Sequence, residues 1–312
     1  MTTRSSLRGE ITGSDPSDIH HNDWVERCLP AWSRPYTRLS RLDRPIGTWL
    51  LLFPGWWGIA LASQRWPDPV LLVLFAVGAV VMRGAGCTLN DIADRHYDGQ
   101  VVRTRRRPLP SGALSVRQAA IFLLLQLALG AAVLFSLNLT TIVLGCAVLG
   151  LIGTYPFMKR ITHWPQVFLG LNFNWGALIG WTAVTGALSW PPLLLYLGGV
   201  FWTIGYDTIY AHQDKEDDVR IGVKSSAIAL GPQTRPWLFV FFSAAILLWA
   251  AAGHAAGLGA LFWVGLVAAA TQLAWQAARV ATEDAADCLR KFRSNRVVGW
   301  LIFAGIIAGH FA

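Results

Sequence analysis

The chain has 312 residues, of which 54% are hydrophobic and only 14% are charged, and it contains 16 tryptophans. This composition is too apolar for an ordinary soluble domain of that length, so the chain is expected in a lipid bilayer. The net charge of +8 requires no nucleic-acid partner, because basic loops that face anionic lipid account for it.

Residues 1–34 form a polar leader ahead of the first apolar segment. The leader lacks a continuous apolar core and a small-residue cleavage site, so it is not a signal peptide. Its acidic residues argue against a transit peptide, which favours a bacterial inner membrane as the location. We expect residues 1–34 to be a disordered cytoplasmic leader and residues 35–312 to form the membrane domain.

Apolar segments follow one another from residue 46 to the end of the chain. A transmembrane helix needs roughly 20 mainly apolar residues. Nine segments approach that length, and they are residues 46–64, 68–89, 117–137, 139–158, 165–187, 191–208, 236–253, 256–278 and 297–312. The last is short, so eight spans is the alternative. The pattern predicts an all-α, multi-pass bundle of about nine transmembrane helices.

The basic residues give the topology of this bundle. If the amino terminus is cytoplasmic, all of the 26 Lys and Arg residues except Arg65 fall on the cytoplasmic side. Two connections on that side are long, residues 90–116 and 209–235, and each begins with a cluster of aspartates. This arrangement suggests two four-helix halves followed by a final helix, with the active site on the cytoplasmic side.

The first acidic cluster lies in LNDIADRHYDGQV, residues 89–101. If the preceding helix continues through it, Asn90, Asp94 and Asp98 fall four residues apart on one stripe, with Asp91 beside them. Ionised carboxylates near a bilayer are costly unless something cationic offsets them. The cluster therefore predicts a cation-binding face at the end of the second span.

The second acidic cluster lies in YDTIYAHQDKEDD, residues 206–218. On a continuous helix Asp207, Asp214 and Asp218 recur at i, i+7 and i+11, with Asp217 close to the same face and Glu216 on the opposite one. Carboxylate and amide oxygens on two facing helices are typical ligands of Mg²⁺. Since Mg²⁺ keeps positions for water and phosphate, two such clusters indicate a diphosphate held between them.

Arginines follow the first cluster in VVRTRRRPLPSG, residues 101–112, and their planar guanidinium groups suit phosphate oxygens.

A cation-coupled transporter is an alternative function for the acidic clusters. Against it, the acids lie at helix ends rather than at the membrane midplane, and the adjacent arginines would repel a passing cation.

Several stretches resemble the UbiA superfamily of intramembrane prenyltransferases. The pattern NDxxDxxxD at residues 90–98 resembles the first metal motif of that superfamily, and DxxxD at residues 214–218 resembles the second. PYTRLSRLDRPIGTWLLLFPGWWG (35–58), KRITHWPQ (159–166) and YDTIYAHQDKEDDVRIGVKSSA (206–227) are similar to the members that act on 4-hydroxybenzoate in ubiquinone biosynthesis.

The resemblance implies helices around a central cavity open to lipid. It implies Mg²⁺-dependent transfer of a polyprenyl group from polyprenyl diphosphate to position 3 of 4-hydroxybenzoate, the ring carbon next to the hydroxyl-bearing carbon. Within the superfamily, homogentisate, a naphthoate, haem or a glycerol lipid is an alternative acceptor.

The motifs give each candidate residue an expected role. One Mg²⁺ would be held by Asn90, Asp94 and Asp98 and a second by Asp214 and Asp218, with Asp91, Asp207 and Asp217 as supporting ligands. The diphosphate would be held by Arg95, Arg103, Lys159, Arg160 and Lys224. Among these, Arg160 is the preferred catalytic candidate beside Asp94, Asp98, Asp214 and Asp218, through its place in KRITHWPQ. Arg44, at the start of the first span, is the candidate for the carboxylate of the acceptor.

Overall fold

The structure is a computed structural model that describes residues 19, 23–100 and 104–311, with the backbone alone at residues 155, 156, 159, 217 and 221. Every regular element in the described part of the chain is helical, as predicted. The elements are α1 (Trp24–Cys28), α2 (Arg34–Leu39), α3 (Ile46–Ala62), α4 (Pro69–Asp98), α5 (Val116–Phe135), α6 (Leu139–Ile161), α7 (Pro165–Asn174), α8 (Gly176–Thr185), α9 (Trp190–Ala211), η1 (His212–Asp214), α10 (Lys215–Ile221), α11 (Ser226–Leu230), η2 (Gly231–Gln233), α12 (Thr234–Ala255), α13 (Ala260–Arg279) and α14 (Ala285–Gly309).

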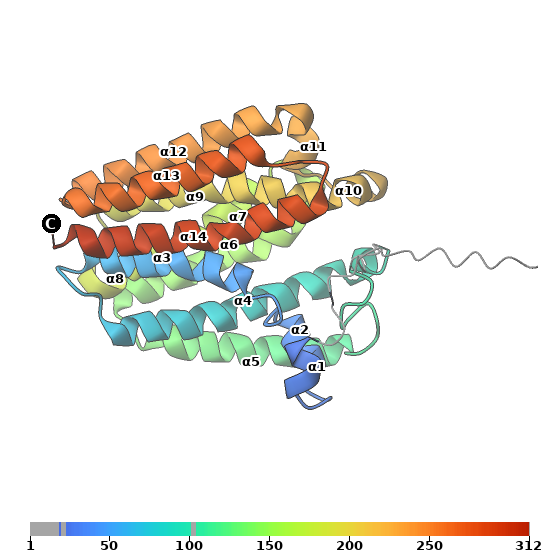
Figure 1. The fold of residues 1–312 in the computed structure, drawn as a ribbon. Coiled ribbons are helices and arrows are strands. Elements are labelled where there is room, and N and C mark those ends of the chain that lie inside the picture. Colours follow the sequence, from blue (N-terminus) through green and yellow to red (C-terminus); the bar gives the residue numbers. More distant parts are fainter. Residues whose placement is uncertain (1–18, 20–22, 101–103, 312) are drawn as a thin grey trace, which may run out of the picture.

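The long helices lie side by side in one bundle, with α3 against α8, α9 against α12 and α13 against α14 (Figure 1). At the centre, the fully buried indoles of Trp57, Trp202 and Trp249 meet with ring centroids 5.2–5.8 Å apart. The end of α4 and the short helix α10 lie at the same end of the bundle, and the carboxyl terminus lies at the other (Figure 1). We call the end that carries the aspartates the acidic end.

Five helical segments of the described residues are long and apolar enough to cross a membrane, rather than the nine that we predicted. They are Pro69–Asp98, Val116–Phe135, Pro165–Thr185, Ser226–Ala255 and Ala260–Arg279, and two shorter apolar helices cover Ile46–Ala62 and Leu139–Thr154. The difference has a chemical reason. Helix α14 begins with charged turns, and α9 is rich in proline, glycine and ring side chains, which lowers the mean hydropathy of both.

Exposed tryptophans mark both ends of the bundle. Trp66 and Trp190 expose 71% and 76% of their surface at the end remote from the aspartates, and Trp237 exposes 43% in the first turn of α12, at the acidic end. Tryptophan is enriched at the two interfaces of a membrane, where its ring contacts lipid and its N–H contacts water. The positions of these side chains therefore fit a bundle whose axis crosses the bilayer.

Helices α3 and α8 approach so closely that only glycine fits between them. A Cβ atom on Gly58 would lie 2.3 Å from the carbonyl oxygen of Ala177, and one on Gly180 would lie 2.3 Å from that of Gly55. Small residues let membrane helices bring their backbones together in this way. The close contact fixes the position of α3, which precedes the helix that carries the first acidic cluster.

The described end of the leader is folded, which differs from the disorder that we expected through residue 34. Helix α1 begins after Asp23, whose side chain accepts a hydrogen bond from the amide of Glu26 at 3.0 Å. The Glu26 carboxylate in turn accepts a hydrogen bond from Arg38 on α2 at 2.7 Å. Residues 1–18 and 20–22 of the predicted leader lie outside the described residues.

Asp287 holds the turn between α13 and α14 at the acidic end. It accepts hydrogen bonds from the amide of Ala281 at 2.9 Å and from Lys291 Nζ at 3.2 Å, and it also pairs with Arg290. Burial alone would raise the pKa of Asp287, but these donors together hold it at about 2, below its ordinary value of 3.8.

Replacing Asp287 by Asn is therefore expected to lower the free energy of unfolding by about 1 kcal/mol at neutral pH, after allowance for screening by solvent. Because the pKa is depressed in the folded state, the contribution is present above pH 4 and disappears as the pH falls toward 2. Thermal unfolding of Asp287→Asn, wild type and the exposed control Glu283→Gln at several pH values measures it. A deficit in Asp287→Asn that does not shrink in acid would contradict the assignment.

Candidate functional site

Helix α4 carries the first acidic cluster in its last three turns. It begins at Pro69, after Asp68 accepts a hydrogen bond from the amide of Val70, and it continues without a break to Asp98. Asp91 and Asp94 are completely buried and Asp98 is 9% exposed. The predicted continuation of the helix is confirmed, and the stripe of acids faces protein rather than water.

Asp91 lies at the centre of a buried network of charges. Its Oδ1 accepts a hydrogen bond from Arg41 Nη2 at 2.7 Å and lies 3.4 Å from Arg107 Nη1, which also donates to Asp98 Oδ2 at 2.9 Å. Arg41 has a φ of 57°, which is uncommon for a residue with a side chain. Two segments remote in sequence thus bring guanidinium groups to one carboxylate, an arrangement that the sequence analysis did not find.

Asp94 pairs with Arg160, the basic residue that KRITHWPQ singled out. Arg160 Nη2 lies 3.2 Å from Asp94 Oδ1, and its guanidinium stacks 4.9 Å from the ring centroid of Tyr97. The Arg160 side chain remains 37% exposed, whereas that of Asp94 is 1% exposed. The carboxylate therefore fixes an arginine that keeps donors available to a ligand.

We predicted one continuous helix through the second acidic cluster, and this prediction is wrong. Helix α9 ends at Ala211, the 3₁₀ turn η1 follows, and α10 begins at Lys215. A 3₁₀ turn has about 3.0 residues per turn instead of 3.6, so it changes the direction of every later side chain. The spacing that placed Asp207 on one face with Asp214 and Asp218 is consequently interrupted between them.

His212 fixes this interruption. Its Nε2 lies 3.0 Å from Thr234 Oγ1 at the start of α12. Burial, with a smaller contribution from Lys215, lowers the pKa of His212 to about 4, so the ring is neutral at neutral pH. A neutral, buried ring therefore joins the end of α9 to the start of α12, shortly before α10 begins.

The end of α6 connects the segments that carry the two clusters. Arg160 contacts Asp94 of the first cluster, and the carbonyl oxygen of the next residue, Ile161, accepts a hydrogen bond from Lys224 Nζ at 3.1 Å. Lys224 follows α10, which carries the second cluster. Both acidic segments are thus held around the last turn of α6.

Arg83 is a further candidate, which the charge pattern of the sequence places only among the basic residues of the cytoplasmic side. It lies within α4, its Nε is buried without a hydrogen-bond partner among the described residues, and its guanidinium lies 5.5 Å from the ring centroid of Phe173. The guanidinium also acts electrostatically on the Asp207 carboxylate of α9. An ionisable residue inside an apolar helix is a sequence signal that could have identified it.

The remaining predicted residues have varied surroundings. The guanidinium of Arg95 donates to the carbonyl oxygen of Ile92 on its own helix at 2.9 Å. Arg44 pairs with the neighbouring Asp43 at 3.0 Å. Asn90 is half-buried. Arg103 lies outside the described residues, as do the side chains of Lys159 and Asp217.

The donors at the acidic end fit Mg²⁺ by their chemistry, because they are carboxylate and amide oxygens. Asp91 Oδ2 is buried and has no hydrogen-bond partner among the described residues. In that same part of the chain, no three His, Cys, Asp or Glu side chains come together closely enough to hold one ion. Magnesium usually binds through one or two carboxylates and completes its shell with water and substrate phosphates, so the donor set suits it.

Relatives of known name are similar over most of the chain. The chain is 49% identical over 300 residues to "4-hydroxybenzoate polyprenyltransferase, mitochondrial" of Arabidopsis thaliana, which covers 95% of this chain and 74% of the relative. It is 48% identical over 289 residues to the human protein of the same name, covering 92% and 78%. These relatives are mitochondrial, which contradicts our prediction of a bacterial inner membrane. That prediction rested on the leader alone, whose composition does not distinguish the two membranes.

Solved structures share the fold. A UbiA homologue from Aeropyrum pernix K1, in its apo form, is 30% identical with a TM-score of 0.72 and covers 83% of this chain and 97% of its own. A UbiA homologue from Archaeoglobus fulgidus bound to GPP and Mg²⁺ is 18% identical with a TM-score of 0.60, covering 89% and 100%. At that identity the second likeness concerns the fold alone. The model of the UbiA prenyltransferase family matches residues 51–304, which is most of the chain, and the chain therefore belongs to that family.

Proposed function

We propose that this protein transfers a polyprenyl group from polyprenyl diphosphate to the ring of 4-hydroxybenzoate, with Mg²⁺ as the metal. The observation that supports this most is the pairing of Asp94 with Arg160 beside a second acidic segment, which Lys224 ties to the same turn of α6. Carboxylates for a metal and guanidinium donors for phosphate then meet at one end of an apolar bundle. Relatives that are 48–49% identical carry the name of this activity.

Within this proposal the aspartates have two kinds of role. Asn90, Asp94 and Asp98 would hold one Mg²⁺, and Asp214 with Asp218 would hold a second. Bound Mg²⁺ would neutralise the negative charge that develops on the departing diphosphate. Asp91 is chiefly a positioning residue, because its Oδ1 already orients Arg41 and Arg107 and only its Oδ2 remains for the shell of the metal.

The arginines would bind the leaving group. Arg160 is directed by Asp94 and Tyr97 and remains partly exposed, so its free N–H donors can bind diphosphate oxygens as the allylic C–O bond breaks. The electron pair of that bond stays on the diphosphate, and the ring carbon ortho to the phenol then forms the new C–C bond and loses its proton. Apolar helices around the site would exclude water, which would otherwise capture the allylic cation.

Arg83 is a better candidate than Arg44 for the carboxylate of the acceptor. Arg44 is paired with Asp43, whereas the buried Nε of Arg83 has no hydrogen-bond partner in the described part of the chain and its guanidinium stacks on an aromatic ring inside the bundle. A guanidinium binds a carboxylate in a planar, two-pronged geometry, and the adjacent Phe173 would pack against an aromatic acid.

We expect Arg83→Gln to raise the KM for 4-hydroxybenzoate by about 30-fold, because a hydrogen bond to a charged group contributes about 2 kcal/mol. The KM for the prenyl diphosphate should change little, and Arg44→Gln, the matched control, should leave both values nearly unchanged. Steady-state kinetics with each substrate varied in turn provide the measurement. A larger rise in the KM for the acceptor in Arg44→Gln than in Arg83→Gln would restore the assignment that the sequence suggested.

The proposed reaction is tested by incubating membranes that contain the protein with Mg²⁺, geranyl diphosphate and labelled 4-hydroxybenzoate. A parallel assay contains homogentisate. Prenylated 4-hydroxybenzoate, formed only with Mg²⁺ and much faster than prenylated homogentisate, is the expected result. If the membranes prenylate homogentisate but not 4-hydroxybenzoate, the proposed acceptor is wrong, although the assignment as a prenyltransferase still holds.

We further propose that nine segments cross the membrane, with α7 and α8 together forming one of them. The exposed tryptophans at both ends of the bundle support this placement. The names of the relatives favour a mitochondrial membrane as the one that holds the chain. Labelling of single cysteines placed in each connection, from either side of sealed vesicles, would count the spans directly.

A further inference from the structure

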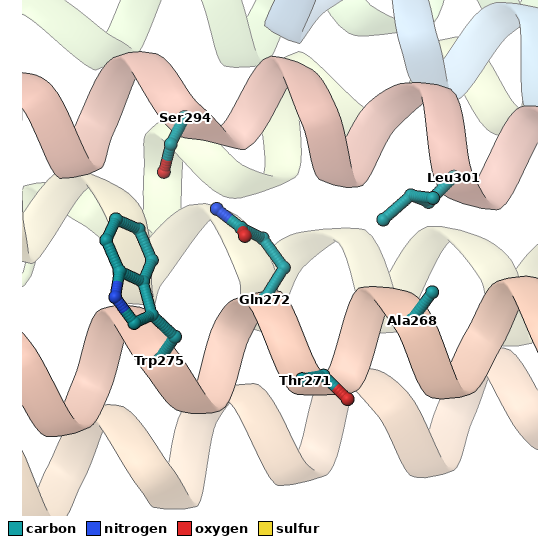
Figure 2. Close-up of a pocket in the computed structure, with 6 residues that line it drawn as sticks. All are labelled: Ala268, Thr271, Gln272, Trp275, Ser294 and Leu301. Carbon is teal, nitrogen blue, oxygen red and sulfur yellow. The ribbon is translucent and has the colours of Figure 1, made fainter.

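A groove lies on the outer surface between α13 and α14, on the opposite side of α14 from its contact with α3. It has a volume of about 450 Å³ and is lined by Ala268, Thr271, Gln272, Trp275, Ser294 and Leu301 (Figure 2). Nearby residues on α13 face outward, since Val264 and Val267 expose 66% and 64% of their surface. In a protein that spans a bilayer, such a surface contacts lipid.

The two ends of the groove differ in chemistry. Leu301 and Ala268 lie at one end, and Trp275 and Ser294 lie at the other, toward the acidic end of the bundle (Figure 2). Trp275 is 41% exposed. The buried ammonium of Lys291 lies 4.0 Å from the centroid of its ring. Because Lys291 is already paired with Asp287, positive charge at this end of the groove must come from the arginines beyond it.

Two exposed arginines continue the lining beyond Trp275 and Ser294. Arg279 follows Trp275 by four residues on α13, and Arg290 precedes Ser294 by four residues on α14. Residues four apart are neighbours on one face of a helix, so both guanidinium groups lie one turn past the polar end of the groove. Arg290 keeps 68% of its side chain exposed although it pairs with Asp287.

We propose that this groove binds an anionic phospholipid, with an acyl chain between α13 and α14 and the phosphate at Arg279 and Arg290. The apolar end matches a hydrocarbon chain, Gln272, Thr271 and Ser294 match the polar linkage below a headgroup, and the arginines match the phosphate charge. Basic pockets between transmembrane helices bind acidic headgroups by this combination of contacts. The site is separate from the aspartates of α4 and α10, so it does not depend on the proposed reaction.

The test uses full-length protein reconstituted in nanodiscs of phosphatidylcholine and phosphatidylglycerol, extracted into detergent and analysed by native mass spectrometry for retained lipid. Wild type is expected to retain phosphatidylglycerol in preference to phosphatidylcholine. The double variant Arg279→Gln/Arg290→Gln should reduce that preference about 25-fold, since each arginine near the surface contributes about fivefold. Thr271→Trp, which fills the groove and keeps both arginines, should abolish retention of either lipid at this site.

Arg296→Gln is the matched control, because Arg296 is exposed on the same helix but lies about 150° around it from the lining residues Ser294 and Leu301. It should retain lipid as wild type does. Equal retention of the two lipids by wild type, an equal loss in Arg296→Gln, or full retention in Thr271→Trp would each overturn the proposal. Displacement of the lipid by inorganic phosphate alone would also overturn it, because the site would then recognise phosphate without a chain.

Discussion

Asp94→Ala and Asp214→Ala are each expected to lower turnover at least a thousandfold, while the protein still inserts into the membrane. The basis for Asp94 is that its fully buried carboxylate lies next to Arg160, the donor that we assign to the leaving group. Removing one charge-stabilising group from an enzyme site typically costs about a hundred- to a thousandfold, and loss of a metal adds to this. The measurement is prenyl transfer per mole of purified protein at saturating Mg²⁺.

Glu216→Ala provides the matched control for these two variants. Glu216 is an exposed acid on α10, two residues from Asp214. It should retain nearly full turnover, because its side chain lies outside the proposed site. Near-normal activity in either aspartate variant, or an equal loss in Glu216→Ala, would remove the specific role that we give to these carboxylates.

Asp91→Ala is expected to lower the free energy of unfolding by about 3 kcal/mol or more, even without metal. Its removal takes from the buried Arg41 the carboxylate that lies 2.7 Å from its Nη2, and it leaves Asp98 to balance the neighbouring Arg107. Asp94→Ala should have a much smaller effect on stability, because its partner Arg160 is 37% exposed and can be solvated. Thermal unfolding of both variants in detergent with EDTA makes the comparison.

The pair of variants separates two roles that the motif NDxxDxxxD does not distinguish. If Asp91 is a magnesium ligand rather than an anchor for arginines, its alanine variant should unfold like wild type in EDTA and lose only the extra stability that added Mg²⁺ confers. That outcome would contradict our assignment of Asp91 as a positioning residue.

Periodicity predicted the part of the site that lies on an unbroken helix. The 100° advance per residue correctly carried α4 through Asp98 and grouped its acids on one buried stripe. The same reasoning was wrong between Asp207 and Asp214, because η1 replaces α-helical geometry over three residues. Nothing in the spacing of aspartates reports such a change, which occurs where His212 contacts Thr234, a residue remote in sequence.

The spacing of residues along the sequence does not predict side chains that pair with the site aspartates from remote segments. Arg41 and Arg107 meet Asp91 across 50 and 16 residues of chain, respectively. Their positions depend on a left-handed residue and on the course of a loop, neither of which leaves a periodic pattern. Arg83 differs, since a lone arginine in an apolar run was visible in the sequence and was attributed to topology instead.

The length of α4 bears on how the enzyme would meet its donor. Its 30 residues span about 45 Å, while the hydrocarbon layer is about 30 Å thick, so its last turns reach the headgroup layer. A polyprenyl tail could then remain dissolved among acyl chains throughout the encounter, avoiding a cost of about 0.8 kcal/mol for each methylene brought into water. Catalysis on such a substrate would be a two-dimensional encounter. Its rate would follow the mole fraction of donor in the bilayer and would fall when inert phospholipid is added at constant bulk concentration.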